Sequence, residues 1–238
     1  MENRRMMVSI LGDSLSTFEG FQPEGYAVFY DEEHKEIAGI KSVYDMWWAK
    51  VNVALKAYLC VNNAYSGSRV SGTAFSAGTS MERIRALRTP KHTPDLILVY
   101  LGLNDFGYGV PLFGKTSRML HKPELAAFSP AYHCKLERLH KQYPHAKIAC
   151  STLMRTTHRD HPDWVFPEQR CSTELEAYNV IIRSAVRKHG CMLADTSALN
   201  RPYETIDGFH PTVVGHRIIA ENWLVCLRQY VSPHLTNS

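Results

Sequence analysis

Five short runs of apolar residues recur along the chain, separated by longer and more polar segments. Each run is four to six residues long, a length that is typical of buried strands. The runs are 6–11, 58–61, 96–101, 147–152 and 191–194. We therefore predict five β-strands.

The segments between these runs carry helix start signals followed by apolar positions at helical spacing. Ser42 with Asp45, and Thr173 with Glu176, have the spacing of a capping box. Pro130 stands where proline is favoured, in the first turn of a helix. Strands that alternate with helices in this way predict parallel β-α-β units. The expected fold class is α/β, with three α/β/α layers.

Two connections are longer than the usual loop of an α/β protein and are expected to decide what the protein binds. The first, residues 18–41, has a pattern that suggests a hairpin formed by residues 26–30 and 36–40. The second, residues 106–128, is rich in glycine, proline and aromatic residues and is expected to form a lid. Because no repeat or linker divides the chain, we expect a single domain over residues 1–238, with an insertion near 18–41.

Composition and charge narrow the choice of partner without changing the predicted fold. The chain has 238 residues, of which 27 are basic and 23 acidic, and its formal net charge is +4. The basic residues are scattered, which argues against nucleic acid or an anionic membrane surface as the partner. We therefore expect a small-molecule partner.

Cysteine usage and the N-terminal segment bear on localisation. The six cysteines lack any C-x-x-C pair, which predicts reduced thiols rather than a disulfide framework. The apolar stretch 6–11 is too short for a signal-peptide core, and no run approaches the roughly 20 residues of a membrane span. We expect a cytoplasmic protein without a membrane span.

Residues with catalytic chemistry follow the predicted strands, at the sheet edge where parallel sheets bind ligands. In chain order they are Ser14, Gly67, Asn104, Asp207 and His210. A serine hydroxyl becomes a nucleophile when a histidine takes its proton and a carboxylate orients that histidine. We therefore predict Ser14 as nucleophile, His210 as base and Asp207 as its partner. The Ser14 amide, the Gly67 amide and the Asn104 side chain are predicted donors to the oxyanion, and no metal or cofactor is expected.

The same residues form four blocks that resemble the SGNH hydrolases, also called GDSL-type lipases or acylhydrolases. The blocks are G-D-S at 12–14, a glycine at 67, G-x-N-D at 102–105 and D-x-x-H at 207–210. They occur in the order found in that family and span almost the whole chain. The resemblance implies a flavodoxin-like five-stranded parallel sheet, carboxylic ester hydrolysis, and the same roles for the triad and the oxyanion hole.

The two long connections also suggest a substrate class. Their aromatic residues are suited to a short acyl group or to an acylated carbohydrate; these residues are Tyr26, Tyr30, Phe106, Tyr108 and Phe113. Neither connection contains the long apolar stretch that would favour triglycerides. The expected substrate is a small-molecule ester with a short-chain or carbohydrate-linked acyl group.

Three alternatives compete with this interpretation. Residues 109–116 fit the phosphate-loop pattern G-x-x-x-x-G-K-T, in which Lys115 would bind a nucleotide, but the predicted strand ends near Leu101, too early for such a loop. Ser76 fits the small-x-Ser-x-Gly elbow of α/β-hydrolases, although the residues before it have loop character. The third alternative is a catalytically silent protein of the same fold that only binds a ligand.

Three polar clusters are interpreted as surface features. The segment 158–163 has two histidines and two aspartates but lacks ligands spaced on a helix face, so we expect a solvated loop rather than a metal site. Arg83 and the other basic residues of 83–91 are interpreted as the solvated face of a helix whose buried stripe includes Ile84. Arg155, which follows the fourth run, is expected to form a surface salt bridge.

Overall fold

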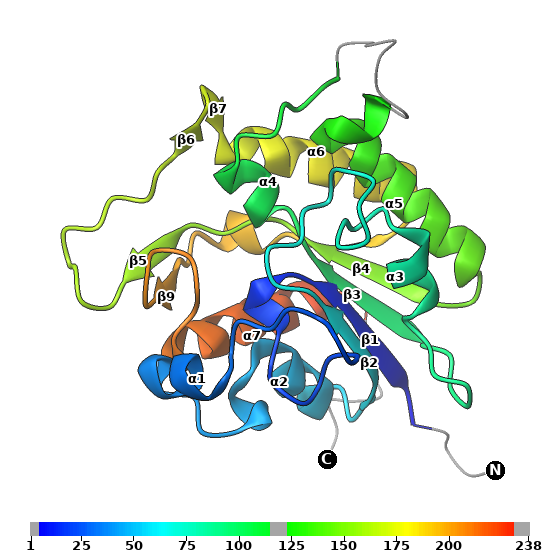
Figure 1. Cartoon of the computed structure of the whole chain (residues 1–238), viewed down its shortest axis with the longest axis horizontal. Helices are drawn as coiled ribbons and strands as arrows, with labels where there is room; N and C mark the ends of the chain where they lie inside the picture. Colours follow the sequence, from blue (N-terminus) through cyan, green and yellow to red (C-terminus); the bar gives the residue numbers. More distant parts are fainter. Residues whose placement is uncertain (1–4, 115–122, 231–238) are drawn as a thin grey trace.

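A five-stranded parallel sheet forms the centre of the protein (Figure 1). The computed structural model describes residues 5–114 and 123–230. The strands are β1 (Met7–Gly12), β2 (Tyr58–Ala64), β3 (Leu96–Tyr100), β4 (Lys147–Ser151) and β8 (Met192–Ala194). Their order across the sheet is β2-β1-β3-β4-β8, the order of flavodoxin-like folds. The predicted fold class is confirmed.

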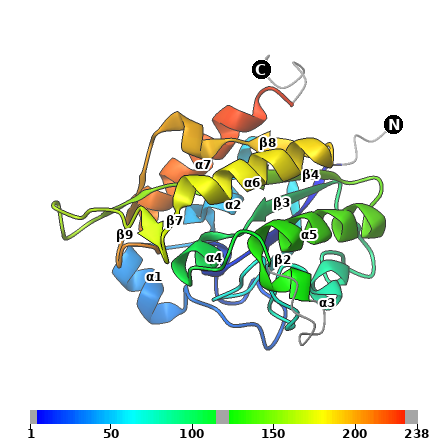
Figure 2. The same cartoon turned by 90° about the horizontal axis from the view of Figure 1, so that it is seen from above.

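Helices cover both faces of this sheet, as Figures 1 and 2 show from two directions. The helices on one face are α2 (Trp47–Ala54) and α7 (Val213–Leu227). Those on the other face are α3 (Met81–Arg85), α5 (Phe128–Gln142) and α6 (Leu175–Lys188). Every residue of the central strand β3 is buried, because a parallel sheet with helices on both faces has no wet side.

Smaller elements gather on the side of the sheet where the strands end (Figure 1). They are α1 (Glu32–Ala38), α4 (Leu103–Gly107), β5 (Thr156–His158), β6 (Gln169–Arg170), β7 (Thr173–Glu174) and β9 (Tyr203–Thr205). Short 3-10 helices lie at Ser14–Ser16, Val43–Asp45, Pro123–Ala126 and Thr196–Leu199. Strands β5 and β9 pair in parallel, and β6 and β7 pair antiparallel. These pieces surround the carboxyl edge of the sheet.

The carboxyl ends of three neighbouring strands are level with one another. Gly12 at the end of β1 pairs with Ala64 at the end of β2 and with Tyr100 at the end of β3. Parallel strands in this register deliver their following residues to one place. The residues after β1, β2 and β3 therefore meet at the same edge of the sheet.

The prediction of a hairpin within residues 18–41 is wrong, because part of this segment forms helix α1. The Asp31 side chain accepts a hydrogen bond from the His34 amide, so Asp31 caps the start of the helix. Gly39 ends the helix with a left-handed φ of 72°, which suits a residue without a Cβ. Local capping chemistry at both ends therefore outweighed the alternation that suggested strands.

The residues of the two predicted capping boxes do not cap the α-helices for which they were predicted. The box formed by Ser42 and Asp45 is present, but it closes a 3-10 turn, and α2 begins later at Trp47. Thr173 lies in β7 rather than at a helix cap, and α6 begins at Leu175. The antiparallel pairing of β7 with β6 satisfies backbone groups that a cap would otherwise have engaged.

The five aromatic residues expected to face a substrate differ in exposure, and Tyr26 is half-buried. Tyr30 and Phe106 are fully buried, so they belong to the core rather than to a substrate surface. Tyr108 and Phe113 are about 70% exposed, at 69% and 70%. The lid expected at 106–128 includes residues 115–122, which lie outside the described part of the chain. The expectation of a lid therefore remains untested there.

Candidate active site

Ser14 lies in the tight turn that directly follows the end of β1. The side chain of Asp13 accepts a hydrogen bond from the Leu15 amide and caps the 3-10 helix that begins at Ser14. The indole N–H groups of Trp47 and Trp48 donate to the hydroxyl and the carbonyl of Ser16, at 3.1 and 3.0 Å. Buried hydrogen bonds thus fix the turn that carries the serine.

The predicted serine, histidine and aspartate are brought together in one chain of hydrogen bonds. His210 Nε2 lies 3.0 Å from Ser14 Oγ, and His210 Nδ1 lies 2.6 Å from Asp207 Oδ2. The other Asp207 oxygen accepts the backbone amides of Phe209 and His210. Partial burial opposes ionisation of Asp207, but these hydrogen bonds and the His210 charge outweigh it and lower the pKa of Asp207 to about 2.

The turn that carries Asp207 and His210 is held by two threonines from the small β5–β9 sheet. Thr156 Oγ1 donates to the Gly208 carbonyl at 2.7 Å, and the Gly208 amide donates to Thr205 Oγ1 at 3.0 Å. Gly208 has a φ of +94°, and a Cβ there would come within 2.5 Å of the Trp164 ring. Both constraints require glycine at this position. Sequence reasoning missed this support, because the pairing of β5 with β9 is not local.

Gly67 lies in the loop after β2, whose last residue, Ala64, pairs with Gly12 just before the serine turn. Its φ of +76° is a left-handed conformation that glycine adopts without strain. The amides of Gly72 and Gly78, the other glycines of this loop, donate to the carbonyls of Leu125 and Arg69. Among the described residues, no acceptor is found for the Gly67 amide or the Ser14 amide. Gly67 is therefore a better candidate for an oxyanion donor than Gly72 or Gly78, whose amides are engaged.

The Asn104 side chain reaches the same place from the first turn of α4. Its Nδ2 donates to the Ser68 carbonyl at 3.0 Å and lies 3.5 Å from Asp13 Oδ2. The next residue, Asp105, is buried and accepts the amides of Val70 and Ser71. Burial raises the pKa of Asp105, and the hydrogen bonds from the Val70 and Ser71 amides oppose this shift. The N-D pair therefore joins the loop after β2 to the loop after β3.

Arg83 corrects the interpretation of residues 83–91 as a solvated face. It is 0% exposed, whereas Arg85 and Arg88 of the same segment are exposed. Its guanidinium donates to the Gly12 carbonyl, to both the side chain and the carbonyl of Asn63, and to the Ser68 hydroxyl and the Ser76 carbonyl. These acceptors lie on three chain segments, so one side chain ties the ends of β1 and β2 to the Gly67 loop.

Asp13 is the second buried charge next to the serine. It is 2% exposed. Burial raises the pKa of Asp13 from 3.8 to about 7, and the Leu15 amide and the Arg83 charge counter only part of that shift. Asp13 therefore takes up a proton on folding between about pH 4 and pH 7, and its ionisation destabilises the native state as the pH rises through this window.

We expect an Asp13→Asn variant to be more stable than the wild type at pH 8, because asparagine fills the same space without a charge. The difference should shrink as the pH falls and should be small at pH 4, where Asp13 is protonated in the folded state and about half protonated in the unfolded state. Urea denaturation at pH 8, 6 and 4 measures this difference. Two stability curves that run parallel over this range would contradict the account.

The rival motifs do not assemble a comparable site. The Ser76 carbonyl is engaged by Arg83 and Ser68, and the imidazole of His210 faces Ser14 instead. Helix α4 separates Gly109 from the end of β3, so the strand does not run into the loop as a phosphate loop requires. Lys115 lies outside the described residues. The surrounding structure thus favours neither motif.

Three cavities differ in their relation to this edge. One cavity of about 260 Å³ adjoins Gly67. It is lined by small residues and by the two larger side chains of Arg69 and Tyr108. One of about 760 Å³ is lined by residues at the beginning of β1 and β2, including Met6 and Tyr58, and so lies at the opposite, amino end of these strands. Of these two cavities, the one beside Gly67 is the one whose lining includes a residue of the candidate site.

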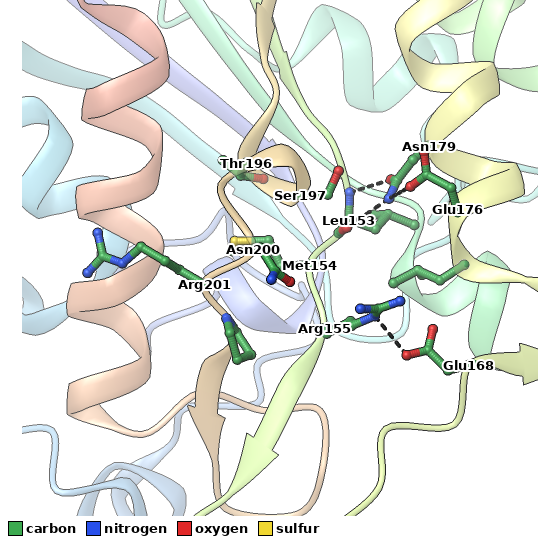
Figure 3. A pocket seen from close by; sticks show the side chains of 12 residues that line it. Leu153, Met154, Arg155, Glu168, Glu176, Asn179, Thr196, Ser197, Asn200 and Arg201 are labelled. Atoms are coloured by element: carbon green, nitrogen blue, oxygen red, sulfur yellow. Dashed lines mark hydrogen bonds and ion pairs between the residues drawn. The ribbon is translucent and has the colours of Figure 1, made fainter.

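The third cavity, of about 250 Å³, lies beyond the ends of β4 and β8 (Figure 3). Arg155 on its wall forms an ion pair with Glu168, as expected for a surface salt bridge, with 2.7 Å between Nε and Oε1. Arg201 pairs with Glu221. The cavity lacks the residues of the serine site, and its arginines are already paired within the protein.

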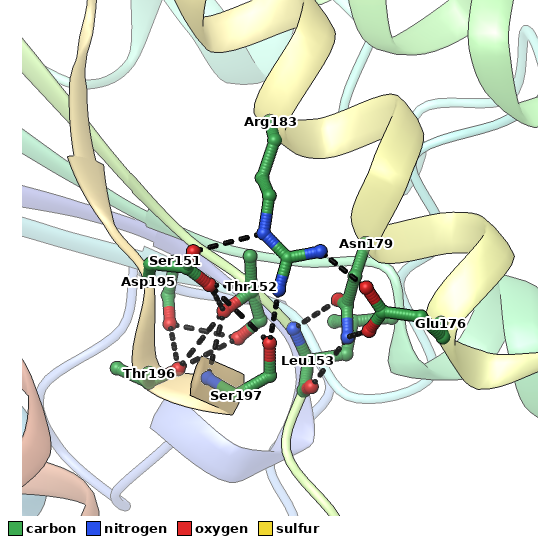
Figure 4. Close-up of polar contacts among 9 residues, drawn as sticks. All are labelled: Ser151, Thr152, Leu153, Glu176, Asn179, Arg183, Asp195, Thr196 and Ser197. Atoms are coloured by element: carbon green, nitrogen blue, oxygen red, sulfur yellow. Dashed lines mark hydrogen bonds and ion pairs between the residues drawn. The ribbon is translucent and has the colours of Figure 1, made fainter. Parts of the chain in front are cut away.

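A polar network beside that cavity fixes the loop after β8 (Figure 4). Arg183 of α6 donates to both carboxylate oxygens of Asp195, at 2.9 and 3.0 Å, and to the Ser197 hydroxyl at 2.8 Å. It also pairs with Glu176. A two-pronged arginine–carboxylate contact sets orientation as well as attraction. This network holds the chain as it leaves the sheet towards β9 and the turn at 207–210.

The described part of the chain holds neither a candidate metal cluster nor a candidate membrane span. Over residues 5–114 and 123–230, no three histidine, cysteine or acidic side chains are grouped so that they could hold a metal ion. Within the same ranges, which contain all six cysteines, no disulfide bond is formed. Within the same described ranges, every helix is too short or too polar to cross a bilayer.

Comparison with known proteins identifies the family. Residues 6–159, more than half of the chain, match the family model of the GDSL-like lipases/acylhydrolases. A search among curated proteins finds no match. The match covers the blocks that contain Ser14, Gly67 and Asn104.

Solved structures of similar proteins agree with this assignment. A protein described as a GDSL-like lipase from Bacteroides uniformis is 28% identical, with 96% of each chain covered and a TM-score of 0.72. Another from Bacteroides ovatus is 24% identical over 94% of this chain and 99% of that one, with a TM-score of 0.69. An alpha/beta hydrolase from the metagenome of Lake Arreo shares the fold at 19% identity, with 95% and 97% covered and a TM-score of 0.55. The chain therefore belongs to the GDSL-like lipase/acylhydrolase family, the SGNH hydrolases.

Proposed function

We propose that the protein is a serine ester hydrolase that acts through an acyl-enzyme on Ser14. The observation that carries this proposal is the continuous chain of hydrogen bonds from Asp207 through His210 to Ser14 Oγ. A histidine held between a carboxylate and a serine hydroxyl is the arrangement that converts the hydroxyl into a nucleophile. Membership of an acylhydrolase family supports an ester as the substrate.

The reaction follows from these contacts in two stages. His210 Nε2 takes the proton of Ser14 Oγ as the oxygen attacks the ester carbonyl, and it then gives the proton to the departing alcohol. Water repeats the sequence on the acyl-enzyme: His210 removes its proton, the acid is released, and the proton returns to Ser14. The Asp207 carboxylate holds the imidazole orientation and stabilises the imidazolium formed in each stage.

The oxyanion of each tetrahedral intermediate is proposed to bind three donors, the Ser14 and Gly67 amides and the Asn104 side-chain amide. One Nδ2 hydrogen of Asn104 is donated to the Ser68 carbonyl, which orients the group, and the other has only a long 3.5 Å contact with Asp13 Oδ2 that a substrate oxyanion can replace. Donors fixed in advance stabilise developing charge without reorganisation.

We expect Asn104→Ala to lower kcat by about 10²- to 10³-fold, because it removes one oxyanion donor. The Michaelis constant should change little, since the donor acts mainly on the charge that develops in the transition state. Steady-state kinetics on a 4-nitrophenyl ester, with Asn200→Ala as an exposed control, measures the effect. Equal losses in both variants would contradict the assigned role.

The substrate is proposed to carry a short acyl group or an acylated carbohydrate. The cavity beside Gly67 has a volume of about 260 Å³ and includes Ser71 and Ser76 in its lining. This is smaller than most pockets for drug-sized ligands, which favours a short acyl group over a long acyl chain. The guanidinium of Arg69 lies over the Tyr108 ring, 5.6 Å from its centroid, and both side chains border the cavity. Such a polar rim is suited to sugar hydroxyls.

A chain-length series tests both parts of the proposal. Hydrolysis of 4-nitrophenyl esters with two to twelve acyl carbons, and of acetylated sugars, should be fastest for the shortest acyl groups. The Ser14→Ala variant, checked for native folding, should lose about 10⁴- to 10⁶-fold in turnover. Equal hydrolysis by both proteins would contradict the assigned nucleophile. Binding of acetylated sugars without turnover would instead favour the catalytically silent alternative, and a rate maximum at ten or twelve carbons would contradict the substrate class.

A further inference from the structure

The aromatic ring of Phe29 lies flat on the imidazole of His210. The ring centroids are 3.5 Å apart, and the planes are 8° from parallel. Neutral aromatic pairs prefer offset or edge-to-face contacts with centroids about 4.5–7 Å apart. A cation, in contrast, is attracted to the electron-rich face of a ring. The observed stack is therefore better suited to a protonated imidazole than to a neutral one.

The segment that carries Phe29 is tied to both catalytic turns. The Phe29 amide donates to Thr17 Oγ1 at 2.9 Å, and that hydroxyl donates to the Ser14 carbonyl at 2.9 Å. The hydroxyl of Tyr30 donates to the Pro211 carbonyl at 2.7 Å, next to His210. The connection 18–41 thus places the Phe29 ring relative to Ser14 and His210 at the same time.

We propose that Phe29 is a positioning residue that stabilises the protonated imidazole of His210 during catalysis. This inference rests on the proposed ester hydrolysis, in which His210 gains a proton as each tetrahedral intermediate forms. An interaction that strengthens in the transition state raises kcat rather than substrate affinity. Asp207 meets the imidazole in its plane, and Phe29 meets it face on.

Other polar groups near this stack have their own partners. The His34 ring packs against Phe29 with centroids 4.4 Å apart, and its Nδ1 lies 2.7 Å from Asp31 Oδ1. The Asp31 carboxylate therefore pairs with His34 at the start of α1 and not with His210. The role assigned to Phe29 consequently depends on the electron density of its ring face.

Fluorinated phenylalanines at position 29 test this role, because fluorine withdraws charge from the ring face while it largely preserves shape. Replacement by the mono-, di- and trifluoro analogues should lower kcat in steps, while the Michaelis constant stays within about twofold. Phe29→Leu should lower kcat by about 3- to 30-fold. Phe29→Tyr should retain most of the activity.

Phe21→Leu is the matched control, since Phe21 belongs to the same connection but contacts Phe18 and Trp48 instead of the triad. Its kcat should equal that of the wild type, and melting temperatures verify folding of every variant. A wild type that reacts at Ser14, combined with a kcat unaffected by fluorination, would overturn the role of Phe29 alone. A wild type that neither hydrolyses esters nor reacts with a fluorophosphonate would overturn the proposed function, and this inference with it.

Discussion

Replacing Ser14 or His210 by alanine is expected to lower kcat for ester hydrolysis by about 10⁴- to 10⁶-fold. Without Ser14 no acyl-enzyme forms, and without His210 the hydroxyl keeps its proton at neutral pH. Ser14 Oγ and His210 Nε2 lie 3.0 Å apart, and the two residues are expected to act as one unit. The Ser14→Ala/His210→Ala double variant should therefore be no slower than the slower single variant.

Steady-state rates of the three variants on a short-chain ester measure this coupling. Multiplied losses in the double variant would show that the two residues act independently, contrary to the account. The residual rate should remain above that of the uncatalysed reaction, because the oxyanion donors and substrate binding are unchanged. Circular dichroism of each variant excludes unfolding as the cause of a loss.

Replacing Arg83 by methionine is expected to lower the free energy of unfolding by about 4–5 kcal/mol, since each buried acceptor left without a donor costs about 1–3 kcal/mol. The Gly12 and Ser76 carbonyls keep a second donor, in Tyr65 and Ser68, so they are not among the acceptors left without one. The guanidinium serves carbonyls and side chains of Gly12, Asn63, Ser68 and Ser76. Burial lowers the pKa of Arg83 to about 10, so the group remains charged at neutral pH. A neutral methionine fills part of the volume but donates no hydrogen bond.

Urea denaturation of Arg83→Met, with Arg85→Met as the control, measures this loss. Arg85 is an exposed neighbour in the same helix, and its replacement should change the free energy of unfolding by less than about 0.5 kcal/mol. Equal effects of the two substitutions would contradict the central position of Arg83. The kcat of Arg83→Met should also fall, because Ser68 links Arg83 to Asn104.

The sheet and the meeting of Ser14, Asp207 and His210 could be predicted because their signals are local and repeated. Each strand is a short apolar run, and the residues that follow it reach the same edge by the geometry of parallel sheets. Ser14, Asp207 and His210 thus meet in the structure as expected. The aspartate and the histidine also share one turn, so their pairing needed no information about distant segments.

The supports of the site could not be predicted, because they depend on contacts between distant segments. Arg83 has the pattern of a surface cation, and only the approach of strand ends from elsewhere supplies its acceptors. Phe29 was hidden in a connection whose secondary structure was predicted incorrectly. Thr156 and Thr205 gain their roles from the pairing of two short strands almost fifty residues apart. The periodicity of a sequence does not predict contacts between segments that are far apart in the chain.

Covalent labelling of Ser14 tests the central claim most directly. Intact mass spectrometry after treatment with a fluorophosphonate should show one adduct on the wild type and none on Ser14→Ala, and peptide mapping should place the adduct on Ser14. Ser76→Ala should be labelled like the wild type. Labelling of Ser14→Ala at the wild-type rate, or an adduct that maps to Ser76, would contradict the account.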